Sequence, residues 1–494
     1  MYLIGYDIGS SSIKAALVEI RTGKAKAVVQ QPAVEMVIDA PQLGWAEQHP
    51  DTWWRYVCQA TRQLLNENDI IPSEIKGVGI SYQMHGLVML NKAGKVIRPS
   101  IIWCDSRAVE IGQDAFEGIG EETCLREMLN SPGNFTASKL AWVKRHEPEL
   151  YAECEKIMLP GDYIAYKLSG EIQTTITGLS EGVLWDFVSN TPAKSVLNYF
   201  GIDDRFLPSI VDSVSLQCTV SELGAEQTGL AKGTPISYRA GDQPNNAMSL
   251  NVLQPGEIAA TGGTSGVVYG VVDKAVYDAR SRVNGFAHVN HSVTEPRIGI
   301  LLCVNGAGIQ YGWLRKMIGP GSSYNELELK ASRATVGADK LSVISFGNGA
   351  ERMLENREIG AHFCNLQLNR HQDSHMIRAT LEGIAFAFIY GMEILKSMGI
   401  EIRSIRVGND NLFQSKIFSS TVATLAGAEI KMIDTTGAIG AALAAGVGIG
   451  IYENFEMAMS NLSIVDEVFP DPDASPYQVA YDQWKGYLDK FLPG

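Results

Sequence analysis

The sequence contains no closely spaced pair of cysteines. Its 7 cysteines are scattered and odd in number, and no C-x-x-C motif occurs among them. Neither a disulfide framework nor a zinc site is therefore predicted. We expect reduced and mostly buried thiols at positions 58, 104, 124, 154, 218, 303 and 364.

Runs of basic residues and long apolar runs are also missing. The chain has 41 Lys and Arg against 55 Asp and Glu, a net charge of -14, so a nucleic-acid partner is not expected. The longest weakly polar stretch, 438–452, is shorter than the roughly 20 residues of a membrane span. The N-terminus has no signal-peptide pattern. We expect a cytoplasmic protein without a membrane partner.

The two commonest nucleotide-binding motifs, G-x-x-x-x-G-K-[ST] and G-x-G-x-x-G, do not occur either. If the protein binds a nucleotide, it must hold the phosphates with a different motif. Because the net charge opposes an anionic ligand, its phosphates would require local donors, namely backbone N–H groups and a divalent cation.

The length and the hydrophobic pattern favour two large domains. At 494 residues, 45% of them hydrophobic, the chain exceeds one ordinary core. Strand-like runs such as 77–81 alternate with helix-like stretches such as 53–65, 376–395 and 412–426, which predicts an α/β fold. Turn residues near 248–256 interrupt this alternation of strands and helices. We therefore place an N-terminal lobe at 1–250 and a C-terminal lobe at 251–494.

A β-hairpin with a glycine and serine turn opens the chain. Residues 2–18 read as two apolar runs joined by Gly9, Ser10, Ser11 and Ser12. Small residues let backbone N–H groups approach an anion, and the hydroxyls add donors.

The same pattern returns at 256–272. In an ungapped alignment of the two segments, Gly9 falls on Gly263 and Ser11 on Ser265, while Asp7 becomes Thr261. Each hairpin alone is more simply an ordinary tight turn. Their pairing in the two halves predicts a duplicated fold whose halves face each other across a nucleotide.

Asp242 stands just before the second hairpin, at the expected lobe junction. Phosphoryl transfer to an alcohol needs a proton acceptor, a cation on the phosphates and donors to the transferred group. Asp242 suits the first role, and Asp7 the orientation of a hydrated cation. An ordinary turn aspartate before a proline remains the alternative for Asp242.

Two further segments suggest ligand contacts. Residues 81–86 follow a strand and carry Gln83 and His85, with Trp103 to Arg107 close behind. Polar side chains beside an aromatic face suit a sugar, although a lone histidine is more often structural. An apolar strand, the turn 408–411 and a helix start suit a nucleotide.

These residues resemble the FGGY carbohydrate kinases of the actin/hexokinase-like superfamily, and within them the xylulokinases. The similarity runs from Asp7 to about residue 450. Its most specific parts are residues 44–54, the tetrad Gln83-Met84-His85-Gly86, and residues 134–143 with 147–149.

The resemblance implies a two-lobed, duplicated, ribonuclease H-like fold with a central cleft. It implies ATP and Mg²⁺ as cofactors, with Asp242 as catalytic base and Asp7 at the magnesium through a bound water. Sugar contacts are expected from Gln83, Met84, His85, Gly86, Asp242 and Gln243. Nucleotide contacts are expected from Asp7, Gly9, Ser10, Ser11, Lys14, Gly263, Thr264, Ser265, Gly306, Gln310, Gly408 and Asn409.

The activity implied is phosphorylation of a small ketose, D-xylulose, to its 5-phosphate. Gluconokinase, ribulokinase, glycerol kinase and a non-catalytic sugar-binding regulator remain alternatives, and dimers are common in the family. Three departures from its pattern bear on specificity: Gln243-Pro244-Asn245 after the base, Gly408-Asn409-Asp410-Asn411 in the adenine turn, and Asn365 where glycine is usual.

Overall fold

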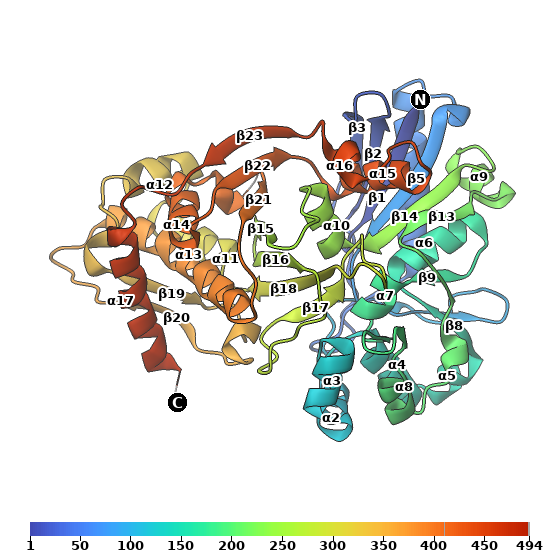
Figure 1. Ribbon diagram of the computed structural model, residues 1–494, viewed down its shortest axis with the longest axis horizontal. Coiled ribbons are helices and arrows are strands. Elements are labelled where there is room, and N and C mark those ends of the chain that lie inside the picture. The colour runs from blue at the N-terminus through green and yellow to red at the C-terminus, as the bar shows by residue number, and fades with distance from the viewer. Residues whose placement is uncertain (410, 493–494) are drawn as a thin grey trace.

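The computed structural model describes residues 1–409 and 411–492 and shows two lobes, each built on one large mixed sheet (Figure 1). The 6-stranded sheet of the first lobe has the order β13-β14-β5-β1-β2-β3. Its strands are β1 Tyr2–Ile8, β2 Ile13–Glu19, β3 Ala25–Gln31, β5 Ile75–Tyr82, β13 Val214–Thr219 and β14 Pro235–Gly241. The 7-stranded sheet of the second lobe has the order β17-β18-β16-β15-β21-β22-β23. Its strands are β15 Glu257–Gly262, β16 Gly266–Val272, β17 Asn284–Ala287, β18 Ile298–Val304, β21 Ser404–Gly408, β22 Ile430–Asp434 and β23 Ser463–Val468.

The two sheets repeat one topology. In the first, β1, β2 and β3 are antiparallel, whereas β1, β5 and β14 are parallel neighbours. In the second, β15, β16 and β18 are antiparallel, whereas β15, β21 and β22 are parallel. The two predicted hairpins are β1–β2 and β15–β16, so the predicted α/β fold with duplicated halves is confirmed.

Helices cover both sheets, and short two-stranded pairs lie outside the two large sheets. The helices of the first half are α1 Pro50–Glu67, α2 Val109–Ile119, α3 Glu121–Met128, α4 Thr136–His146, α5 Pro148–Glu153, α6 Pro160–Ser169, α7 Ile176–Glu181, α8 Lys194–Phe200, α9 Glu222–Thr228 and α10 Asp242–Ser249. Those of the second half are α11 Gly308–Ile318, α12 Tyr324–Ala331, α13 Asp373–Ser397, α14 Lys416–Ala426, α15 Gly437–Gly448, α16 Phe455–Met459 and α17 Ser475–Phe491. The pairs are β4 Glu47–Gln48 with β7 Ser100–Ile101, β6 Val88–Asn91 with β8 Cys154–Met158, β9 Gln173–Thr175 with β12 Ser209–Val211, β10 Trp185–Asp186 with β11 Thr191–Pro192, and β19 Ser342–Phe346 with β20 Gly360–Cys364. Across the described part of the chain, none of the helices combines the length and the apolar character needed to cross a membrane.

Helix α1 shows why these segments fold as they do. Its buried residues recur at helical spacing, from Trp53 and Val57 to Leu64, so that one face packs on β2 and β3. Pro50 begins the helix, where its missing N–H costs nothing.

Helix α15 lies in the second half of the sequence but packs on the first sheet, where Figure 1 shows it among the strands near the N-terminus. The approach is close because glycines of β1 and β5 face it. A Cβ at Gly5 would lie 1.9 Å from the carbonyl oxygen of Ala438, and one at Gly79 would lie 2.0 Å from that of Ala441. The first lobe is thus completed by a segment far along the chain.

We expect Gly79→Ala to lower the free energy of unfolding by about 1–3 kcal/mol, because the added methyl group would push α15 away from β5. Thermal unfolding checks this. The control is Gly486→Ala in α17, where a Cβ would meet nothing within 4 Å. That change should be neutral or stabilising by up to about 1 kcal/mol, since alanine favours helix more than glycine does. Equal midpoints for the two variants would contradict the close packing.

Asn365 follows β20 and has a φ of 62°. Asparagine is among the few residues other than glycine that adopt this left-handed conformation readily. Its Nδ2 also donates a hydrogen bond to the carbonyl oxygen of Lys340 at 3.0 Å. The departure at this position therefore preserves the backbone shape that glycine would allow.

Candidate active site

Two carboxylates gather where strands of the first sheet end. Asp7 lies near the end of β1, opposite Lys14 on β2 and beside Ser81 on β5. The hydroxyl of Ser81 donates to Oδ1 of Asp7 at 3.3 Å. Asp242 follows Gly241, the last residue of β14, and begins α10. Because β1, β5 and β14 are parallel, their carboxyl ends reach the same edge of the sheet, where ligands of α/β proteins commonly bind.

A pocket of about 260 Å³ lies at this edge. Of the residues predicted to bind ligands, the structure brings together here the two carboxylates, the first glycine and serine turn, the lysine opposite Asp7 and one amide. The lining residues are Asp7, Gly9, Ser10, Ser11, Ser12, Lys14, Gln83, Trp103 and Asp242.

Asp242 has the electrostatics of a proton acceptor. Burial and the neighbouring carboxylate of Asp7 raise the pKa of Asp242 to about 7. A general base is most effective when its pKa lies near the working pH. Burial also raises the pKa of Asp7, although Lys14 and the hydroxyl of Ser81 oppose that effect.

The first hairpin turn is tight and faces the pocket. The N–H of Gly9 donates to the carbonyl oxygen of Ser12 at 3.1 Å, and a Cβ at Gly9 would lie 3.0 Å from that same oxygen. Ser10 accepts a hydrogen bond from the indole of Trp103 at 3.3 Å. Small residues thus leave room for an anion beside the turn.

The second turn is anchored to the start of α11. The N–H groups of Gly308 and Ile309 donate to the carbonyl oxygens of Gly263 and Thr264, both at 3.0 Å. Beside it lies a larger pocket of about 790 Å³, in the size range of a nucleotide site. It is lined by Gly262, Gly263, Thr264, Gly308, Ile309, Tyr311, Gly312, Trp313, Lys316, Tyr324, Asn325, Glu328, Asn411, Leu412, Gln414 and Ser415.

Several predicted nucleotide contacts do not line this larger pocket. Ser265 is exposed at the turn, and Gln310 is buried in α11. Gly306 is packed so tightly that a Cβ would lie 1.6 Å from the carbonyl oxygen of Ser345. Gly408 ends β21, and the carbonyl of Asn409 accepts from Gln414 at 3.2 Å. Asp410 of the adenine turn lies outside the described residues.

Sequence reasoning missed the aromatic wall of the larger pocket. The rings of Tyr311 and Tyr324 lie 5.2 Å apart, centre to centre, on α11 and α12. Trp313 lines the same pocket and is 48% exposed. The available signal in the sequence was the pair of aromatic residues, Tyr311 and Trp313, that follows the turn at 305–308. Planar rings of this kind can stack on the base of a nucleotide.

The tetrad after β5 divides between the cleft and the core. Gln83 lines the smaller pocket, and neither its amide oxygen nor its amide nitrogen has a hydrogen-bond partner in the described part of the chain. Met84 is buried in the hydrophobic core. A Cβ at Gly86 would lie 2.6 Å from Cγ of Pro160, so close packing requires this glycine.

His85 is a neutral hydrogen-bond acceptor. Its Nδ1 donates to the carbonyl oxygen of Glu181 at 2.8 Å, which leaves Nε2 without a proton. Burial lowers the pKa of His85 to about 3, so the imidazole remains neutral near pH 7. The ring lies 4.6 Å from that of Phe135 and 5.5 Å from that of Phe286, centre to centre.

The residues after Asp242 serve different purposes. Gln243 is half-buried and forms a hydrogen bond with the carboxylate of Asp242. Asn245 is buried, accepts from the hydroxyl of Tyr238 at 3.0 Å, and donates to the carbonyl of Gly437 at 3.0 Å. Asn245 therefore joins α10 to the start of α15, whereas Gln243 is the departure that contacts the carboxylate of Asp242.

Within the described residues, no group of three or more His, Cys, Asp or Glu side chains could hold a metal ion. The half-buried carboxylate of Asp7 in the smaller pocket nevertheless suits Mg²⁺. That ion commonly keeps several waters and binds through one or two carboxylates together with substrate phosphates.

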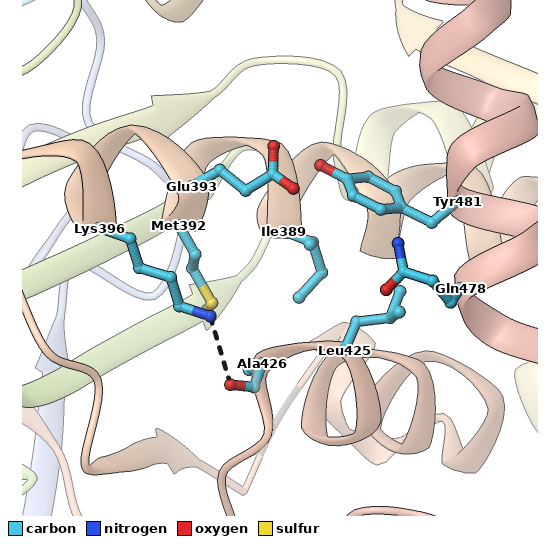
Figure 2. A pocket seen from close by; sticks show the side chains of 8 residues that line it. All are labelled: Ile389, Met392, Glu393, Lys396, Leu425, Ala426, Gln478 and Tyr481. Atoms are coloured by element: carbon cyan, nitrogen blue, oxygen red, sulfur yellow. Dashed lines mark hydrogen bonds between the residues drawn. The ribbon is translucent and has the colours of Figure 1, made fainter. Parts of the chain in front are cut away.

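A third cavity is too small to matter for substrate binding. It lies between α13, α14 and α17, has a volume of about 40 Å³, and contains none of the predicted ligand-binding residues (Figure 2). On one side Nζ of Lys396 donates to the carbonyl of Ala426 at 3.5 Å.

Comparison with family models decides the relationship. Residues 2–249 match the N-terminal domain, and residues 258–449 the C-terminal domain, of the FGGY family of carbohydrate kinases. The chain belongs to this family. The resemblance read from the sequence is confirmed, and membership of the FGGY carbohydrate kinases implies a phosphotransferase that uses ATP.

Several relatives of the chain are named xylulose kinase. The protein from Staphylococcus xylosus is 26% identical over 99% of this chain and 100% of its own length. The protein from Bacillus subtilis is 27% identical over 92% of this chain and 90% of its own length. Among solved structures, the xylulose kinase of Rhodospirillum rubrum matches with a TM-score of 0.90 at 23% identity, covering 100% of this chain and 99% of that one. This likeness confirms the two-lobed FGGY kinase fold.

Proposed function

We propose that the chain transfers the γ-phosphoryl group of ATP to the terminal hydroxyl of D-xylulose, giving D-xylulose 5-phosphate and ADP. The observation that carries the proposal is the meeting of Asp7, Asp242 and the Gly9–Ser12 turn in one pocket. The FGGY relatives named xylulose kinase, which align with nearly the whole chain, support the choice of sugar.

The two lobes have different tasks in this proposal. The N-terminal lobe, 1–250 together with α15, holds the sugar and the base, and the C-terminal lobe, 251–494 apart from α15, holds the nucleotide in the larger pocket. Closure of the cleft would align the phosphate with the sugar and exclude water. We also propose a homodimer in the cytoplasm, where ATP is available as the donor.

Asp242 accepts the proton of the attacking hydroxyl in this mechanism. Nε2 of His85 accepts a hydrogen bond from another hydroxyl of the sugar, and Gln243 holds the carboxylate of Asp242 in place. Lys14 and the N–H groups of the two glycine turns donate to the phosphates. Mg²⁺ bound beside Asp7 would neutralise charge on the phosphate oxygens.

A panel of acceptors tests the function. We expect D-xylulose to give a higher kcat/KM than D-ribulose, L-ribulose, glycerol or D-gluconate when ADP release is coupled to a spectroscopic signal. A higher value for another acceptor would reassign the sugar within the family. Nucleotide binding without turnover on any acceptor would instead favour a sugar-binding regulator.

A further inference from the structure

Glu351 is a buried acid that the proposed mechanism does not use. It has an exposed fraction of 0%, and its own N–H donates to the carbonyl oxygen of Arg357 at 3.1 Å. Oε2 accepts the backbone N–H of Asn305 and Oε1 that of Gly306, both at 3.1 Å. An ionised carboxylate accepts through both oxygens, whereas a protonated one carries an O–H donor in place of one acceptor. The pair of hydrogen bonds therefore depends on the ionised form.

The backbone that Glu351 binds leads to the second glycine turn. Residues 305–307 connect the end of β18 to the start of α11. The first N–H groups of α11, those of Gly308 and Ile309, donate to the carbonyl oxygens of the turn at 263–264, both at 3.0 Å. Glu351, this connection and the second glycine turn thus form a continuous chain of contacts. A change in the charge of the carboxyl can reach the turn through them.

Other hydrogen bonds join the same two segments at the surface. Nδ2 of Asn305 donates to the carbonyl oxygen of Ala350 at 2.8 Å, and Nδ2 of Asn348 donates to the carbonyl oxygen of Asn305 at 3.2 Å. Water can replace these exposed bonds if they break. The N–H of Gly306 is buried, so the loss of its bond to Glu351 is the costly one.

Burial makes the charge of Glu351 sensitive to pH near neutrality. It raises the pKa of Glu351 to about 7, although the two N–H groups oppose the shift. On β18, burial raises the pKa of the Cys303 thiol to about 11, and Glu351 and Asp242 raise it further, so this neighbour stays neutral. The adjacent cation, Arg352, donates from Nε and Nη2 to Ser281 instead. Burial and the two N–H groups therefore decide the charge of Glu351.

Resting on the proposed function, we propose that Glu351 is a positioning residue for ATP, whose ionised carboxylate holds the second glycine turn in the shape that donates to the phosphates. Protonation would place an O–H against one of the two N–H groups, and two donors cannot bond to each other. Leaving a buried N–H unpaired is costly, so the turn would shift to relieve it. Nucleotide affinity is therefore highest above pH 7 and falls as Glu351 gains its proton.

Calorimetric binding of β,γ-methylene-ATP with Mg²⁺, at pH 6 and at pH 8, tests this assignment on the wild type and on Glu351→Gln. The glutamine keeps the shape of the side chain, but its NH₂ group faces one of the N–H groups at every pH, as the protonated acid does. The ratio of the two dissociation constants at each pH removes the effect of protons that the nucleotide itself binds.

At pH 8 we expect the variant to bind about tenfold more weakly, the effect of about one charge-assisted hydrogen bond. At pH 6 the wild type is mostly protonated, so the two dissociation constants should differ by about twofold or less. Affinity for D-xylulose should be the same in both proteins. A ratio of one at pH 8, an equal ratio at both pH values, or an equal loss of sugar affinity would overturn the proposal.

Glu382→Gln is the matched control. Glu382 is also a buried carboxylate of the second lobe that accepts a backbone N–H, that of Gly337 at 3.1 Å, but this N–H belongs to the segment before β19. The variant is expected to change the unfolding midpoint and to bind the analogue as the wild type does at both pH values.

A second variant keeps the test decisive if Glu351→Gln does not fold. The carboxylate of Glu351→Asp is too short to reach both N–H groups, so it should also weaken binding of the analogue at pH 8, and unchanged binding would overturn the proposal. The measurement needs no turnover. If no acceptor is phosphorylated, the proposed function fails, yet the binding ratio still decides the role of Glu351. If the wild type does not bind the analogue, both proposals fail.

Discussion

Replacing Asp242 with asparagine is expected to lower kcat by about 10²–10⁴-fold, the usual contribution of a general base. Asparagine keeps the shape of the side chain but cannot accept the hydroxyl proton. The dissociation constants of sugar and ATP should change much less, because the base acts chiefly in the transition state. Steady-state kinetics combined with calorimetric binding measures both effects.

Asp373→Asn is the matched control, since Asp373 also begins a helix, α13, but is exposed in the other lobe. Its kinetics should match those of the wild type. Equal losses of turnover and sugar affinity in Asp242→Asn would contradict the assignment of Asp242 as base.

The raised pKa of Asp242 gives the same assignment a pH signature. Burial and Asp7 raise that pKa to about 7, and only the ionised carboxylate can accept a proton. The value of kcat/KM should therefore fall about tenfold for each pH unit below about 7. Asp242→Asn should lose this acid limb. A wild-type profile that stays flat down to pH 5 would exclude Asp242 as the titrating base.

Asp7→Asn is expected to lower kcat by on the order of 10²-fold and to raise the Mg²⁺ concentration needed for half-maximal turnover. The variant keeps the acceptor for the Ser81 hydroxyl but removes the negative charge that faces the pocket. Turnover measured across a Mg²⁺ titration at fixed ATP separates a metal role from a general loss.

The control for Asp7 is Asp39→Asn, an exposed carboxylate of the same lobe. It should have wild-type kinetics at every Mg²⁺ concentration. If the loss of turnover in Asp7→Asn is the same at every Mg²⁺ concentration, Asp7 does not bind the metal, and its role is structural.

Local patterns predicted most of the elements near the site. The run at 53–65 lies within α1, that at 376–395 within α13, and both hairpins form as read from the sequence. Each depends on contacts between residues close along the chain, which periodicity and turn residues report directly. The predicted helix at 412–426 is divided instead. A short 3-10 turn at Asn411–Gln414 precedes α14, whose first turn is capped by the hydroxyl of Ser415.

Side-chain direction could not be read in this way. Met84 and His85 are neighbours in the sequence, yet Met84 packs into the core while His85, at a φ of 64°, presents a half-buried ring. His85 lies in the turn after β5, which ends at Tyr82, and its left-handed backbone does not follow the alternation of a strand. That conformation is supported by Lys139, whose ammonium group binds the carbonyl of His85 from far along the chain.

The sequence by itself determined the duplicated α/β fold, the family, and the two glycine turns with Asp7 and Asp242 beside them. These features are local, or they repeat within one chain. Only the tertiary structure decided that α15 completes the first lobe, that Tyr311 and Tyr324 wall the larger pocket, and that Glu181 lies against Gly241. Such contacts join segments distant in sequence, and packing in three dimensions selects them through shape and burial that no local pattern encodes.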